Sequence, residues 1–111
     1  MAISFKKTGL SLIVRIDGEI DANTAKSLRC EIDIEYDEVG ARDIVFDFSK
    51  VSFMDSSGIG MIIGRYKKVQ AVSGKIKMFA VDSNIKKIID LSGLGQLVKI
   101  YRSEKEATGV R

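Results

Sequence analysis

The stretch FMDSSGIGMIIGRYKK, residues 53–68, joins a small polar segment to an apolar run. Apolar side chains recur every three or four residues after Gly58, which predicts an amphipathic helix. Asp, Ser and Gly are favoured at helix N-termini, where they satisfy or tolerate free N–H groups. Gly60 and Gly64 need a further explanation, because a glycine inside a helix costs about 1 kcal/mol relative to alanine. They are four residues apart, so they lie on one face and permit close approach of the sheet or of a partner.

The rest of the chain alternates between strand and helix patterns. Period-two alternation predicts strands, helical spacing predicts helices, and a tight turn is expected at Thr8-Gly9. Expected strands cover residues 3–5, 10–16, 43–48, 76–81 and 98–100, and expected helices cover residues 21–39, 57–72, 83–91 and a terminal segment from residue 103. The predicted helix boundaries are N-caps at Asp21, Ser83 and Ser103 and terminating glycines at Gly40 and Gly74. The apolar faces of the first two predicted helices are expected to point to the core. They consist of Ala25, Leu28, Ile32, Tyr36 and Val39 in the first helix and of Ile59, Ile62, Ile63, Tyr66, Val69 and Val72 in the second.

The resulting order, β-β-α-β-α-β-α-β-α, predicts the α/β class. Strand–helix–strand units favour parallel neighbours with right-handed crossovers, and the opening hairpin adds an antiparallel pair. We therefore expect one mixed sheet packed with about four helices. A length of 111 residues predicts one domain over residues 1–111, because it supplies a single core of two layers.

Composition excludes several kinds of chemistry. Histidine is absent, which removes Ser-His-Asp and Cys-His machinery, and Cys30 is the one cysteine, which removes a disulfide framework. The net charge of +3 comes from scattered or paired lysines, so we expect no direct nucleic-acid partner. No apolar run approaches the roughly 20 residues of a membrane span, and the N-terminus has no signal-peptide core. These features predict a cytoplasmic protein without a membrane partner.

A dinucleotide site is one alternative for the glycines. Gly58, Gly60 and Gly64 form GxGxxxG before a helix, and Asp82 lies where a ribose-binding acid would. Against this hypothesis, the expected strand ends near Phe48, about nine residues too early for a phosphate-binding turn. The chain also offers no second domain for a substrate.

A modified serine is a second alternative. A hydroxyl at a helix N-terminus lies where the dipole and the free N–H groups favour added negative charge. Phosphorylation would add about −1.5 to −2 charges and suit a switch on a binding face, although this argument does not choose between Ser56 and Ser57. A third alternative, a receiver phosphorylated on Asp47 or Asp55, needs a carboxylate cluster for Mg²⁺, and the opening hairpin speaks against it.

Four segments resemble the STAS domains, and within them the bacterial anti-sigma factor antagonists of the sporulation type. The most specific is SFMDSSGIGMIIGRYKKV (52–69), and the others are GEID (18–21), IVFDFSKV (44–51) and DLSGLGQLVKIYRSEKEA (90–107). The resemblance covers nearly the whole chain. Residues 22–41 match weakly, and DSNIKK (82–87) replaces a form in which the family usually has proline.

The resemblance implies a regulator that is not an enzyme and needs no cofactor or metal. An anti-sigma factor that is itself a serine kinase would bind the unphosphorylated form, release its sigma factor, and phosphorylate Ser56; a PP2C-type phosphatase would reset the switch. The implied partner-binding residues are Asp21, Asp55, Ser56, Ser57, Gly58 and Ile59. Three alternatives stay open: a general-stress antagonist of the same family, a nucleotide-binding module using Gly58 and Gly60, and a STAS scaffold or transporter module.

Overall fold

The computed structural model describes residues 1–109 of the chain. Within that part, the elements follow one another in the order expected from the sequence. The strands are β1 (Ala2–Thr8), β2 (Ser11–Ile20), β3 (Asp43–Met54), β4 (Ile76–Phe79) and β5 (Lys99–Tyr101). The helices are α1 (Ala22–Val39), α2 (Ser56–Gln70), α3 (Ser83–Leu91) and α4 (Glu104–Thr108), with a short 3-10 helix η1 (Leu94–Gln96) before β5.

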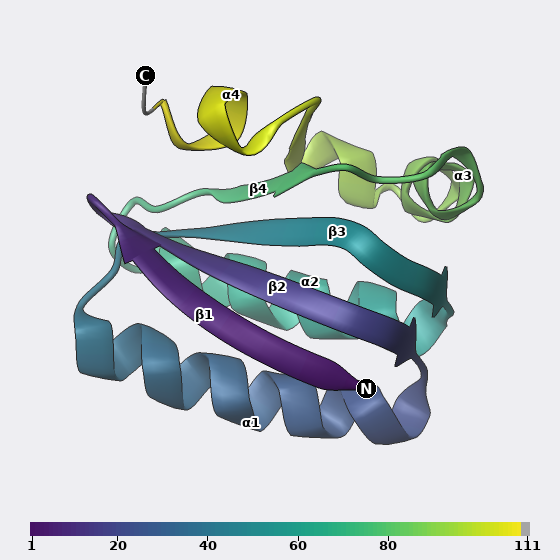
Figure 1. Cartoon of the computed structure of the whole chain (residues 1–111), viewed down its shortest axis with the longest axis horizontal. Coiled ribbons are helices and arrows are strands. Elements are labelled where there is room, and N and C mark those ends of the chain that lie inside the picture. The colour runs from purple at the N-terminus through teal and green to yellow at the C-terminus, as the bar shows by residue number, and fades with distance from the viewer. Residues whose placement is uncertain (110–111) are drawn as a thin grey trace.

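The five strands form one sheet in the order β1-β2-β3-β4-β5 (Figure 1). β1 pairs with β2 antiparallel, through a turn in which Gly9 has a φ of 60°, and every other neighbouring pair is parallel. This topology confirms the predicted α/β fold with a mixed sheet and an opening hairpin. Parallel pairing brings the carboxyl ends of β2 and β3 to the same edge, where α1 and α2 begin.

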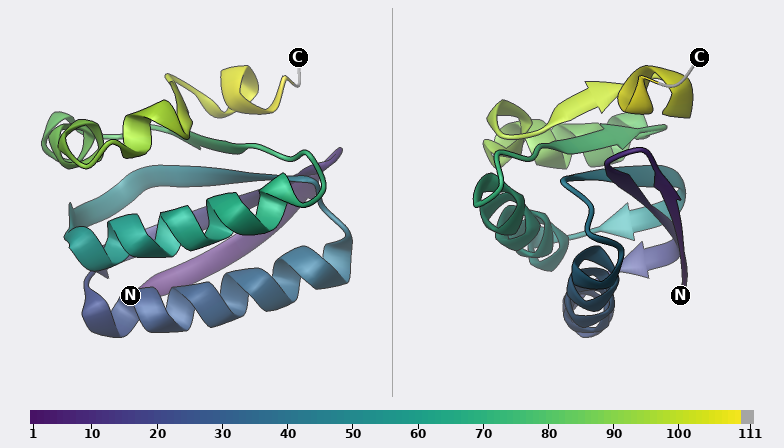
Figure 2. Two further views of the ribbon diagram at one scale, coloured as in Figure 1. Left: turned by 180° about the vertical axis from the view of Figure 1, so that it is seen from behind. Right: turned by 90° about the vertical axis from the view of Figure 1, so that its left-hand side faces the viewer.

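Helices pack on both faces of the sheet, three on one face and the short α4 on the other. The long helices α1 and α2 lie side by side on one face (Figure 2), where alternate strand residues pack against α1, α2 and α3. This main core contains Leu12, Val14, Ile16, Ile44, Phe46 and Phe48 from the sheet and Leu28, Ile32, Ile62, Ile85 and Ile89 from the helices. On the other face, Ile13, Val45 and Phe79 pack against Ala107 of α4. No helix within residues 1–109 has the length and hydropathy that crossing a membrane requires.

Strand β3 is longer than the sequence predicts. The expected strand covered residues 43–48, whereas β3 continues to Met54, which pairs with Ile20. Buried Val51 and Met54 hold this extension on the core, and two register shifts along β2 accommodate it. The predicted gap of nine residues between the strand and Gly58 is therefore wrong, because β3 ends at Met54 and leads directly into Asp55, the N-cap of α2.

Several predicted boundaries also differ by a few residues. Asp82, not Ser83, caps α3, and its Oδ1 accepts a hydrogen bond from the Ile85 N–H at 2.9 Å. Ala80 has a φ of 58°, which ends β4 at Phe79 instead of residue 81. Val72 is exposed because α2 ends at Gln70. The predicted N-caps at Asp21 and Ser103 and the terminating Gly40 are confirmed.

Candidate partner-binding site

Two helix N-termini meet at the carboxyl edge of the parallel strands. β2 leads into α1 through Asp21, and β3 leads into α2 through Asp55. The Asp55 N–H donates to the carbonyl oxygen of Ile20 at 3.2 Å, so the two connections are held against each other. Figure 1 shows both helices starting at this edge. The structure therefore brings Asp21 and Asp55, the two predicted acidic site residues, to one end of the sheet.

Asp21 is fixed by a capping box. Its Oδ1 accepts hydrogen bonds from the N–H groups of Asn23 and Thr24, both at 3.0 Å, and the Thr24 hydroxyl oxygen accepts from the Asp21 N–H at 2.9 Å. The hydrogen bond from the Thr24 N–H is the main reason that the pKa of Asp21 lies below its usual value. Asp21 is thus a fixed negative charge at the start of α1.

Asp55 plays the same structural role in α2. Its Oδ1 accepts from the Ser57 N–H at 2.8 Å, and its carbonyl oxygen accepts from the Gly58 N–H at 3.0 Å. Ser56 is the first residue of the helix and is exposed, whereas Ser57 is half-buried. Within residues 1–109, no hydrogen bond engages the Ser56 hydroxyl. The geometry therefore presents the side chain of Ser56 to solvent more openly than that of Ser57.

Gly58 and Ile59 belong to the interior of the site. A Cβ on Gly58 would overlap Met54 Cγ and lie 3.0 Å from Ile20 Cγ2, so only glycine lets the first turn of α2 lie on the strand ends. Ile59 is 7% exposed and packs in the main core. These two predicted site residues are buried, and they fix the position of the first turn of α2, which carries Ser56.

Gly60 and Gly64 are different, because the fold does not require them. A Cβ at either position would meet no atom within 4 Å. Both line a groove of about 480 Å³ between α1 and α2, in which basic side chains accompany the glycines. The lining consists of Ala22, Ala25, Lys26, Arg29, Ser57, Gly60, Met61, Gly64 and Arg65. Close approach of the sheet therefore does not explain these two glycines, and both face the groove.

A buried ion pair that the sequence pattern did not predict joins α1 and α2 at this groove. Arg65 is 6% exposed, and its Nε lies 2.8 Å from Asp33 Oδ1 of α1. The contact is ionic, because the N–H does not point at the carboxylate oxygen well enough for a hydrogen bond; Arg65 Nη1 donates to the Met61 carbonyl oxygen at 3.3 Å. Burial lowers the pKa of Arg65 and Asp33 opposes that effect. The spacing of Arg65 in the sequence could have indicated its burial, because it lies four residues from both Met61 and Val69, which are buried on the same face of α2.

Phe53 is a second residue near the site that the sequence pattern did not single out. It lies near the end of β3, two residues before Asp55, and 46% of its surface is exposed. Its neighbour Met54 is buried, so Phe53 faces away from the core.

The receiver alternative does not fit the positions of its aspartates. Asp47 lies on the α4 face of the sheet, where its Oδ2 accepts from Arg15 Nη1 at 2.8 Å and its Oδ1 accepts from the Ser49 N–H at 2.9 Å. Asp55 is at the strand end, capping α2. Asp82, the expected ribose-binding acid of the dinucleotide alternative, caps α3. No group of three or more metal-ligating side chains occurs within residues 1–109.

The fold and the site define a small α/β domain that presents a serine on the first turn of a central helix. The chain belongs to the STAS domain family, whose model matches residues 2–107. This assignment agrees with the resemblance carried by the DSSG segment and its flanks.

Individual relatives extend the comparison over most of the chain. An anti-sigma F factor antagonist of Paenibacillus polymyxa is 35% identical, covering 86% of this chain and 82% of the relative. An anti-sigma-B factor antagonist of Bacillus subtilis is 31% identical, covering 98% and 96% respectively.

The structure of the anti-sigma factor antagonist SpoIIAA in its unphosphorylated form has a TM-score of 0.83, with 28% identity over 96% of this chain and 93% of that chain. The Bacillus SpoIIAA in its phosphorylated form has a TM-score of 0.76, with 28% identity over 99% and 100%.

Proposed function

We propose that this chain is an anti-sigma factor antagonist controlled by phosphorylation of Ser56. In the unphosphorylated form it binds an anti-sigma factor that is a serine kinase, and the sigma factor is released. The observation that carries the proposal is the exposed, unbonded hydroxyl of Ser56 at the start of α2. The named relatives and the existence of SpoIIAA in phosphorylated and unphosphorylated forms support the assignment.

Local electrostatics supplies the switch. A phosphate on Ser56 would add about −1.5 to −2 charges, and the N-terminal N–H groups of α2 favour that charge without refolding. In a complex, the same charge would be covered by the partner and lie near the carboxylates of Asp21 and Asp55. Leaving such a charge buried and unpaired typically costs about 3–5 kcal/mol. Phosphorylation would thus prevent binding while the antagonist itself stays folded.

The proposed contact surface is built from the exposed members of the site. It contains Ser56 and Ser57, the capping aspartates beside them, and the open face of α2 at Gly60. Gly58 and Ile59 act from the interior by setting the position of the first turn. A PP2C-type phosphatase would restore binding by removing the phosphate, and the cycle would operate in the cytoplasm with transcription as its output.

The test is to mix the protein with the cognate anti-sigma kinase, with and without ATP, and to follow complex and mass together. We expect a complex without ATP, a single phosphate on Ser56 with ATP, and loss of the complex. Ser56→Ala should bind constitutively and Ser56→Asp should not release the sigma factor. Ser57→Ala is the matched control and should still be phosphorylated. Wild-type affinity of Ser56→Asp by calorimetry would refute the electrostatic switch.

The general-stress branch is the second candidate, favoured by the Bacillus subtilis relative, which matches almost the full length of both chains. We place this chain in the sporulation branch because the sigma F antagonist is more similar per aligned residue. A competition between the sporulation-type and stress-type anti-sigma kinases decides between them. Preferential capture by the stress-type kinase would reverse the assignment.

A further inference from the structure

The seam between α1 and α2 carries ion pairs along its second half. Asp33 Oδ1 lies 2.8 Å from Arg65 Nε. One turn further on, Asp37 Oδ1 lies 3.1 Å from Lys68 Nζ. In both pairs α1 supplies the carboxylate and α2 supplies the cation. Because both helices start at the same edge of the sheet and run side by side (Figure 2), the seam extends back to their first turns.

The first half of the seam has a different composition. Here α1 supplies Lys26 and Arg29, which are exposed and lie three residues apart on one face of the helix. Opposite them α2 supplies Gly60 and Gly64, which have no side chain to meet these cations, and the groove of about 480 Å³ results. Within residues 1–109, Lys26 and Arg29 form no ion pair, and no acidic residue lines the groove.

The positive charge in the groove is not fully compensated. Burial lowers the pKa of Arg65, Asp33 raises it, and the positive charge of Arg29 lowers it again. Arg29 therefore lies near enough to Arg65 to repel it. A carboxylate placed in the groove would be attracted by Lys26 and Arg29 and would offset this repulsion.

The groove adjoins the surface around Ser56. Ser57 and Ala22 line it, and they are the residues that follow Ser56 and the capping Asp21. A protein that covers the start of α2 therefore also reaches the two cations of the groove. The capping aspartates give the start of this surface negative charge, and the groove gives the adjoining part positive charge. Complementary charges on a partner would fix the orientation in which it binds.

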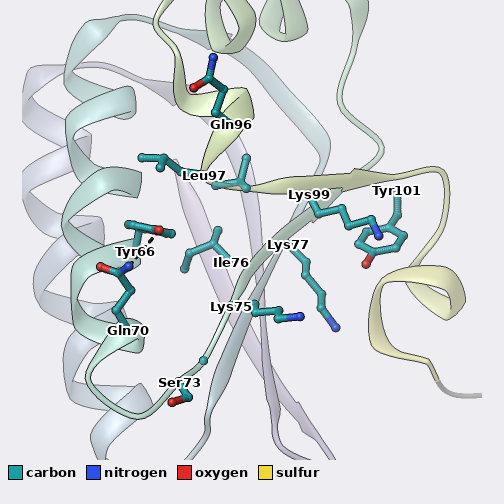
Figure 3. Close-up of a pocket in the computed structure, with 12 residues that line it drawn as sticks. Tyr66, Gln70, Ser73, Lys75, Ile76, Lys77, Gln96, Leu97, Lys99 and Tyr101 are labelled. Carbon is teal, nitrogen blue, oxygen red and sulfur yellow. Dashed lines mark hydrogen bonds between the residues drawn. The ribbon is translucent and has the colours of Figure 1, made fainter.

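A second group of cations near the start of β4 lacks this convergence. Lys75, Lys77 and Lys99 line a pocket there together with Tyr66 of α2. The three lysine side chains project away from α2, whereas Tyr66 lies on the α2 side (Figure 3). Lys77 Nζ also has Asp43 Oδ2 at 3.9 Å. Charged and apolar groups of that pocket therefore do not meet on one ligand, whereas the cations and glycines of the α1–α2 groove line one surface.

We propose that the α1–α2 groove binds an acidic segment of the anti-sigma kinase, with a carboxylate of that partner at Lys26 and Arg29. This inference rests on the proposed function, because it names the chemistry of the partner surface that covers Ser56. A protein segment is favoured over a nucleic acid, because the groove, as formed by the described residues, offers two unpaired cations and no aromatic side chain for a base to stack on. Gly60 and Gly64 leave the space through which the carboxylate reaches the cations.

Charge reversal in the full chain tests the proposal against the cognate anti-sigma kinase. Lys26→Glu and Arg29→Glu should each weaken the complex at least about tenfold, and Lys26→Gln and Arg29→Gln should weaken it less. The association rate of the wild type should fall more steeply with added salt than the rates of the reversed variants. All four variants should keep the wild-type melting temperature, because both positions are exposed and these residue types have similar helix propensities.

Lys7→Glu is the matched control. It makes the same change of charge at an exposed position that pairs with Leu12 near the start of β2, at the opposite end of that strand from Asp21. This variant should bind the kinase as wild type does. An equal loss of affinity in Lys7→Glu and in the groove variants would show general charge attraction and would overturn the role assigned to Lys26 and Arg29.

Two further outcomes would overturn the proposal, and they differ in what they say of the proposed function. Wild-type affinity of Lys26→Glu and Arg29→Glu would remove the groove contact and leave the proposed function standing, whereas failure of the wild type to form any complex would overturn both. Tighter binding of a thymidine oligonucleotide than of the kinase, lost in the reversed variants, would make the groove a nucleic-acid site instead.

Discussion

Replacing Gly60 and Gly64 by alanine should raise the stability of the antagonist and lower its affinity for the anti-sigma kinase. Both glycines lie inside α2, where alanine is favoured by about 1 kcal/mol per position, and a Cβ at either position meets no atom within 4 Å. The double variant should therefore raise the free energy of unfolding by about 2 kcal/mol. For a chain of this size, each 1 kcal/mol corresponds to roughly 4 °C in melting temperature, so we expect a rise of about 8 °C.

Binding to the anti-sigma kinase should change in the opposite direction. The two added methyl groups enter the groove between α1 and α2, next to Ser57. If the partner packs closely there, overfilling the contact costs about 1–3 kcal/mol, which is roughly a 5- to 150-fold loss of affinity. Urea denaturation of the free protein and calorimetry of the complex measure the two effects separately.

Gly74→Ala is the control for this argument. Its Cβ would overlap the backbone carbonyl oxygen of Arg42, which lies between α1 and β3 and does not line the groove. This variant should lose stability while keeping the affinity of whatever fraction remains folded. Wild-type affinity of the Gly60→Ala, Gly64→Ala variant would refute a partner contact at these glycines, and an unchanged melting temperature would refute the steric analysis of α2.

Two further predictions concern charges in the fold. Asp33→Ala removes the partner of buried Arg65, and because the Asp33 side chain is 31% exposed, we expect a loss of about 1–3 kcal/mol in the free energy of unfolding. Urea denaturation measures this loss, and a value under about 0.5 kcal/mol would mean that the pair contributes little. Burial raises the pKa of Asp43, but hydrogen bonds from Arg42 and from the Lys75 N–H outweigh it, so the pKa lies below its usual value. Asp43 therefore stabilises the fold above its unfolded pKa of about 4 and loses this effect as the pH falls through the folded value. Asp43→Asn should be less stable by about 1–3 kcal/mol at pH 7, and a difference from wild type that does not shrink below about pH 4 would contradict this sign.

The order of elements was predictable because each one carries its own local signal. Alternation along β2 and helical spacing along α1 reflect which side of each element meets the core, and Asp21 and Asp55 are side chains that helix starts select. Gly58 was identified from the same pattern, although its reason is tertiary, since only the strand ends beneath it exclude a Cβ. Local chemistry is therefore sufficient to place the exposed serine.

The features that were not predicted depend on residues far apart in the chain. β3 runs past its apolar segment because β2 offers partners as far as Ile20, through register shifts that no local pattern encodes. Asp33 and Arg65 meet only because α1 and α2 pack together. Lys77 and Lys99 likewise become neighbours only once β5 pairs with β4. Predicting these features requires knowing which strands and helices are neighbours in the fold, and hydrophobic periodicity along the chain does not give that information.

The start of α2 combines features that favour a covalent phosphate with features that oppose burying it. The free N–H groups and the unbonded Ser56 hydroxyl favour the phosphate, while the carboxylates of Asp21 and Asp55 make that charge unfavourable once a partner covers it. Because α2 is packed on the core through Ile62 and Val69, the phosphate changes the surface without moving the helix that carries it. Phosphorylation of Ser56 should therefore lower the affinity for the kinase and leave the fold of the free antagonist unchanged.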